Sequence, residues 1–174
     1  IGPLFHHYGV PRMPDLLSVD IDGNDFHLLA SILHREYRPR VVIVETVFQL
    51  NSDWDAVVSY AADHRWDGTC YSSASVSAYY RMARYFNYSL VLGMLPDLYW
   101  VRDDVLATTV GANGYESTND VKRILEIANP LHAFSDCQLT WRSRGFVSSA
   151  QAMRSANRRL ARTVARQMDR YQGR

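Results

Sequence analysis

The sequence predicts an α/β fold in which strands alternate with helices and an antiparallel hairpin follows. Two short apolar runs, 15–21 (DLLSVDI) and 40–46 (RVVIVET), are typical of buried parallel strands. The segment between them is long enough for the helical crossover that joins parallel strands. Two more strand-like runs, YSLVLGML and LYWVRDDV, are separated only by Pro96 and Asp97, and so short a break predicts a hairpin.

Apolar residues at three-to-four spacing predict the helices. This spacing occurs over 25–36 and again over 73–87. A short helix is expected over 119–128, and a long amphipathic helix is expected from 147 nearly to the end. We therefore expect an α/β domain over 1–110, a loop-rich connector with a short helix over 111–146, and a basic amphipathic helix over 147–174.

The C-terminal helix carries an unbalanced charge. Residues 147–174 contain seven arginines and one aspartate, so their net charge is +6, which leaves −5 for residues 1–146 if the chain totals +1. A solvated helix face usually carries acids as well, to form pairs along the helix. We therefore expect this stripe to contact an anionic partner, which could be an acidic protein surface, lipid headgroups or RNA. The predicted partner-binding residues are Arg154, Arg158, Arg162, Arg166 and Arg170.

Composition restricts the class of protein. With 174 residues, 47% apolar and 21% charged, the chain is typical of a single globular domain. No apolar run approaches the roughly 18 residues of a membrane span. Two cysteines are too few for a disulfide framework, so we expect reduced thiols in a reducing compartment. The chain begins with Ile1 rather than Met, as it would after removal of an organelle-targeting peptide or as a trimmed fragment.

Acidic residues end both predicted parallel strands. Asp20 and Asp22 follow the first strand, and Glu45 ends the second. Because ligands of open α/β sheets bind at the carboxyl ends of the strands, we expect these three residues to face one crevice. Asp25, by contrast, is expected to turn the chain and support the start of the helix.

Two other interpretations of the acidic run fit less well. A calcium-binding EF-hand loop needs Gly where Asp25 stands and Glu where Ser31 stands. The strand-end DxDG also resembles the nucleophile motif of haloacid-dehalogenase phosphatases, but Asn24 replaces their Thr. These phosphatases also need a lysine ahead of a later acidic pair, which Asp103 and Asp104 could imitate, but the only lysine, Lys122, lies after that pair. Six histidines without ligand spacing predict no zinc site.

Four segments in order resemble the second half of FkbM-type S-adenosylmethionine-dependent methyltransferases. They are PRMPDLLSVDIDGNDFHLL, YRPRVVIVE, RWDGTCYSSASVSAYYRMARYFNYSLV and LYWVRDDVL, and they cover most of residues 10–106. The resemblance implies a partial Rossmann-like sheet of parallel strands and a final hairpin. It also implies that Asp20, Asp22 and Glu45 line the acceptor side.

The chain departs from that family's pattern at several positions. No glycine-rich turn for the cofactor precedes Asp15. Thr46 follows Glu45 where the family usually has Asn, and a serine-rich SSAS replaces the family's GASL-like segment. The departures imply a domain that lacks the cofactor-binding half and has an eroded site.

We therefore expect a non-catalytic, methyltransferase-like accessory or scaffold subunit of a larger protein assembly, which would be organellar if a targeting peptide has been removed. Such a subunit would bind no cofactor and no metal, and it would dock through the basic helix and an exposed sheet edge. One alternative is an active methyltransferase that uses S-adenosylmethionine, with its cofactor-binding half outside this chain. A weaker alternative is a ribonucleoprotein subunit.

Overall fold

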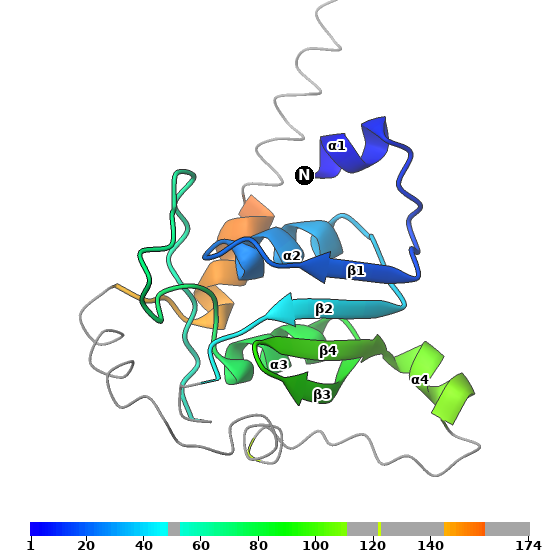
Figure 1. Ribbon diagram of the computed structural model, residues 1–174. Coiled ribbons are helices and arrows are strands. Elements are labelled where there is room, and N and C mark those ends of the chain that lie inside the picture. The colour runs from blue at the N-terminus through cyan, green and yellow to red at the C-terminus, as the bar shows by residue number, and fades with distance from the viewer. Residues whose placement is uncertain (49–52, 111–121, 123–144, 159–174) are drawn as a thin grey trace, which may run out of the picture.

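The structure is a computed structural model, and it describes residues 1–48, 53–110, 122 and 145–158. A four-stranded sheet of order β1-β2-β4-β3 forms its centre (Figure 1). The strands β1 and β2 are parallel, and β3 and β4 form an antiparallel hairpin, as the sequence predicts. Strand β4 also pairs antiparallel with β2, a pairing that the sequence did not predict. Their bounds are Leu16–Val19 for β1, Val41–Glu45 for β2, Tyr88–Met94 for β3 and Asp97–Arg102 for β4.

Four helices have their bounds within the described residues. They are α1 (Gly2–His7), α2 (Asp25–His34), α3 (Val76–Tyr85) and α4 (Asp103–Val110). The predicted helices over 25–36 and 73–87 correspond to α2 and α3. The sequence did not predict α1 or α4. The run LYWVRDDV was predicted to stay extended, but the strand ends at Arg102 and two aspartates begin α4, where carboxylates favour a helix N-terminus.

One face of the sheet is packed against α2 and α3. Alternate strand residues on this face join helix side chains in a single core cluster. Trp100 of β4, Tyr79 of α3 and Phe26 of α2 are among its fully buried members. Tyr79 contacts both of the other rings, with centroids 5.8 Å from Trp100 and 5.4 Å from Phe26. We call this side the packed face.

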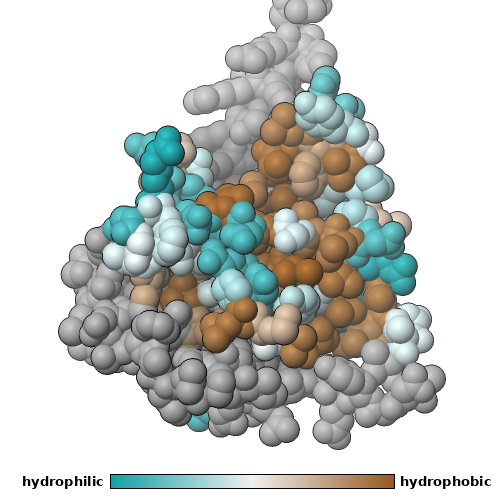
Figure 2. Space-filling view, in the orientation of Figure 1, coloured by the Kyte–Doolittle hydropathy of each residue, from teal (hydrophilic) through white to brown (hydrophobic). Residues whose placement is uncertain are grey.

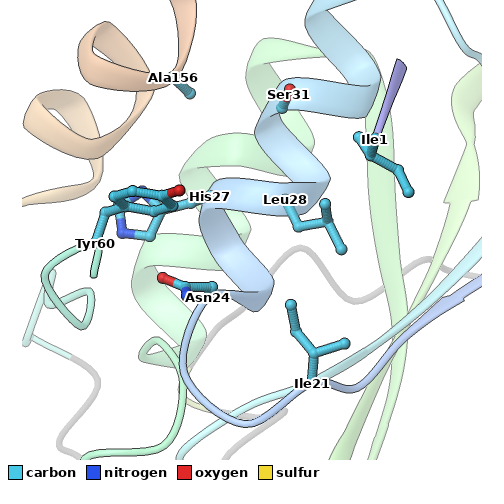
Figure 3. Close-up of a pocket in the computed structure, with 8 residues that line it drawn as sticks. All are labelled: Ile1, Ile21, Asn24, His27, Leu28, Ser31, Tyr60 and Ala156. Carbon is cyan, nitrogen blue, oxygen red and sulfur yellow. The ribbon is translucent and has the colours of Figure 1, made fainter. Parts of the chain in front are cut away.

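The other side of the sheet carries apolar residues that are only partly buried. We call this side the open face. The strand register places on it, among others, Leu16, Ser18, Val41, Ile43, Tyr99 and Val101. None of them belongs to a core cluster of the described residues. Figure 2 shows apolar residues gathered over the strands on the face turned toward the viewer. Strand β1 is also an edge of the sheet, and Leu16 on it is 55% exposed.

The described part of the C-terminal helix belongs to the core. Helical residues run from 149 to 158, and Ala152 and Ala156 are buried in the core cluster. Val147 exchanges two backbone hydrogen bonds with Val57, and Ser149 binds the carboxylate of Asp55. These residues are therefore packed into the fold and do not form a separate element for attachment to a partner. Residues 159–174, most of the predicted connector and the short helix over 119–128 lie outside the described residues.

The predictions about cysteines and membrane spans can be compared with the structure. Cys70 takes part in a disulfide bond, so the expectation of reduced thiols is wrong for this residue. A count of two cysteines argues against a framework of several disulfides, but it does not exclude one. Among the described residues, no helix is both long enough and apolar enough to cross a membrane.

Candidate functional site: a cluster of strand-end carboxylates

The structure brings the three predicted acids together. Asp20 follows β1, Asp22 lies two residues further, and Glu45 is the last residue of β2. One carboxylate oxygen from each lies within 4.8 Å of the other two. We call Asp20, Asp22 and Glu45 the carboxylate cluster. Two side chains are exposed and that of Glu45 is partly buried, so the cluster lies at the surface at the carboxyl end of the parallel pair.

A tight turn between β1 and α2 positions Asp20 and Asp22. Asp22 and Gly23 both have positive φ, at 51° and 118°. The buried carboxylate of Asp25 accepts hydrogen bonds from the backbone N–H of Ile21 at 2.8 Å and of Gly23 at 2.9 Å. Asp25 therefore shapes the turn, as the sequence predicted. A non-glycine residue with positive φ is uncommon, so this geometry at Asp22 depends on the contacts around it.

Gly23 is required at this turn for a second reason. A Cβ placed on Gly23 would lie 2.1 Å from the His64 ring, so only glycine lets the ring approach the backbone this closely. Asn24 holds the other side of the turn, where its side-chain amide donates to the carbonyl of Ala61 at 2.7 Å. The segment around residues 61–64 is thus part of the support of the site. No sequence pattern identified it, because a packing contact across about forty residues leaves no local periodicity.

The serine-rich segment supports Glu45 from the neighbouring strand end. The Ser73 hydroxyl donates to the Glu45 backbone carbonyl at 2.8 Å, and the Thr46 hydroxyl donates to the Ala74 carbonyl at 2.8 Å. Ser75 caps α3 through the Ala78 N–H. The positions where the sequence departs from the methyltransferase pattern therefore fix the end of β2 with buried hydrogen bonds.

Electrostatic repulsion and burial act strongly on Glu45. Burial, together with the smaller effects of the charges of Asp25, Asp20, Asp22 and Asp97, raises the pKa of Glu45 to about 7. Its Oε2 atom is buried and accepts no hydrogen bond from the described protein. Asp97 lies opposite Glu45 in the β2–β4 register, and burial with the charge of Asp20 raises the pKa of Asp97 as well. None of the ion pairs among the described residues involves these acids.

This arrangement permits two kinds of chemistry. A carboxyl group with a pKa near 7 is suited to accept and return a proton at neutral pH. The oxygens of the carboxylate cluster are also ligands that Mg²⁺, Mn²⁺ or Ca²⁺ accept, and their separation is compatible with ligands about 2.1–2.4 Å from one ion. Asp97 and Asp25 were not predicted to influence Glu45. A sequence search could have found Asp97 only by also predicting the register of the hairpin.

The arginine stripe is described only at its start. Arg154 and Arg158 lie on the helix whose Ala152 and Ala156 are buried. Arg162, Arg166 and Arg170 lie outside the described residues. Contact of this stripe with an anionic partner stays a prediction.

Comparison with known proteins gives no assignment. The chain matches no protein-family model, no curated protein and no solved structure. Its function must therefore be argued from its own residues.

Proposed function

We propose that this chain forms the acceptor side of an S-adenosylmethionine-dependent methyltransferase. The observation that carries the proposal is the carboxylate cluster, in which Glu45 has a pKa of about 7 and a buried oxygen without a hydrogen-bond partner among the described residues. The resemblance of residues 10–106 to FkbM-type methyltransferases supplies the reaction class. The described residues include no glycine-rich turn for the cofactor, so we assign no cofactor contact to this chain. The cofactor-binding half would come from polypeptide outside residues 1–174.

In this proposal Glu45 is the general base. A hydroxyl or protonated amine on the acceptor loses its proton to the Glu45 carboxylate, which leaves a lone pair free to attack a methyl group. Asp20 and Asp22 attract an acceptor that is cationic or donates hydrogen bonds, because their charges have no ion-pair partner among the described residues. The pKa of Glu45 matches proton transfer near pH 7, where such a base contributes about 10²–10⁴-fold to the rate.

The test uses the native protein that contains this chain, with release of S-adenosylhomocysteine as the readout. We expect Glu45→Gln to lower kcat by about 10²-fold or more and to remove a rate increase centred near pH 7. Asp15→Asn is the matched control, because Asp15 is highly exposed at the opposite end of β1 and pairs with Arg40. Unchanged activity in Glu45→Gln, or no methyl transfer by the native protein, would contradict the proposal.

A non-catalytic accessory subunit is the second candidate, and the free edge of β1 favours it. Within the described ranges this strand pairs with β2 alone, and its exposed residues Leu16 and Ser18 carry no charge that would deter pairing. Calorimetric titration of the native protein with S-adenosylhomocysteine separates the two candidates. Saturable binding at micromolar ligand supports the methyltransferase, and no binding by a folded protein supports the accessory subunit.

A further inference from the structure

The two sides of the sheet differ in what covers them, although their strands are apolar on both sides. On β2, Val42 and Val44 are fully buried beneath the helices, while Val41 and Ile43 on the open face are only partly buried. Strands that are apolar on both sides are typical of parallel sheets with a helical layer on each face. The β1–β2 pair is parallel and has such a layer on the packed face only, among the described residues.

The two ends of the open face differ in their charged residues. At the carboxyl end of β1 and β2 lie Glu45, Asp97 and the two aspartates of the turn, and no ion pair among the described residues neutralises them. At the other end the acids are paired with arginine, because Arg40 pairs with Asp15 at 3.2 Å and Arg102 pairs with Asp104 at 2.6 Å. A partner on this face therefore meets apolar surface along its length and unneutralised negative charge at one end.

From these observations we propose that the open face binds an amphipathic α-helix of a partner polypeptide, antiparallel to β1 and β2. In this orientation the helix N-terminus, which carries about half a positive charge, lies at the acidic end. Lysine or arginine in the first helical turn would strengthen the contact, and an apolar stripe would cover Leu16, Ile43 and Tyr99. The inference does not depend on catalysis by Glu45, since it uses only the surface and the charge.

A helix fits this face better than a second copy of the sheet does. Two packed sheets are typical of all-antiparallel sheets, whereas this sheet is mixed and its open face includes the parallel β1–β2 pair. Two copies would also each bring an acidic end, and only one relative orientation would keep these ends apart. A single helix with a cationic N-terminal turn would neutralise the negative charge at the acidic end directly.

The probes for the test are two stapled helical peptides of about 18 residues, long enough to cross the sheet. Both carry the same apolar stripe of Leu and Ala. The first has Lys in its first turn and Glu in its last, and the second has these charges exchanged. Affinity for the whole chain is measured by fluorescence anisotropy at low ionic strength, about 0.01 M, where screening is weak.

We expect the first peptide to bind about tenfold more tightly than the second, and we expect raised salt to reduce the difference. Ile43→Lys should abolish binding of both peptides, and Leu16→Lys serves as a second variant in case Ile43→Lys does not fold. Tyr85→Lys is the matched control, because Tyr85 is an exposed aromatic residue at the end of α3, 63% accessible, and should leave both affinities unchanged.

Three results would overturn the inference. Equal affinity for the two peptides would mean that the bound helix has no preferred direction relative to β1 and β2. Binding that survives both Ile43→Lys and Leu16→Lys would mean that the peptides bind outside the open face. Sedimentation that reveals a dimer of the chain, dispersed by Ile43→Lys, would assign the open face to a second copy.

Discussion

The packed face and the open face of the sheet belong to the same strands, but their side chains differ in how far they are removed from water. On β4, Trp100 is fully buried against α3, and its neighbour Tyr99 points to the other side and stays partly accessible. The packed face supplies the stability of the domain, because its side chains are removed from water within this chain. The open face keeps apolar surface and unneutralised acids at its carboxyl end, and these are features that a ligand or partner can use. The effects of substituting adjacent residues on one strand can therefore be compared.

The largest expected difference is between Trp100 and Tyr99. Trp100→Ala should lower the free energy of unfolding by about 3–5 kcal/mol, because it leaves a cavity among α3, β3 and β4. Tyr99→Ala should cost about 1 kcal/mol or less, since much of its side-chain surface is already in contact with water. Urea denaturation of the two variants measures both values. Similar losses for the two would mean that the open face is a second core, and the contrast would be wrong.

A smaller effect is expected from pH through Glu45, at the acidic end of the open face. The pKa of Glu45 rises from an ordinary value of 4.5 to about 7 on folding, so the folded protein binds this proton more tightly than the unfolded chain does. Its contribution to stability is therefore complete below pH 4.5 and is lost as the pH rises through 7. Because Glu45 is only partly buried, solvent screening reduces the change to about 1 kcal/mol.

Glu45→Gln isolates this contribution, since glutamine has a similar shape and no charge. Thermal or urea unfolding at pH 5 and pH 8 should show that the variant gains stability relative to the parent as the pH rises. Asp15→Asn is again the control. A variant whose stability follows that of the parent at both pH values would contradict the raised pKa.

The smallest expected effect is at the free edge. Leu16→Lys should change the free energy of unfolding by less than about 0.5 kcal/mol, because the side chain is already largely in water. The charge should also reduce self-association of the edge strand, which light scattering at high protein concentration can follow. A large loss of stability would mean that Leu16 is covered in solution, in disagreement with an open face.

Local periodicity was enough to predict the sheet. The parallel pair, its crossover helix α2 and the hairpin all follow from short runs whose apolar spacing differs between strand and helix. The start of α4 was missed because Asp103 and Asp104 continue an apolar strand, and the helix-favouring effect of their charges is weak until the strand has ended.

The site was predicted only in part, for a related reason. Asp20, Asp22 and Glu45 end neighbouring strands, and parallel topology alone places them together. The raised pKa of Glu45 also depends on Asp97 and on burial, and neither can be obtained without the hairpin register. Contacts that span long stretches of sequence are not encoded in any local pattern.

The joining of Val57 to Val147 determines the order in which the domain can fold. The two backbone hydrogen bonds of this bridge, and the bond from Ser149 to Asp55 across 94 residues, bring helix 149–158 back to a segment made much earlier in synthesis. Contacts of such high sequence separation slow folding, because the chain loses the entropy of closing a long loop before the contact stabilises the fold. On a ribosome, the sheet and its hairpin would be complete while the sites for Ala152 and Ala156 still stood empty. For that interval the part of the core that Ala152 and Ala156 cover in the folded domain would remain exposed to water.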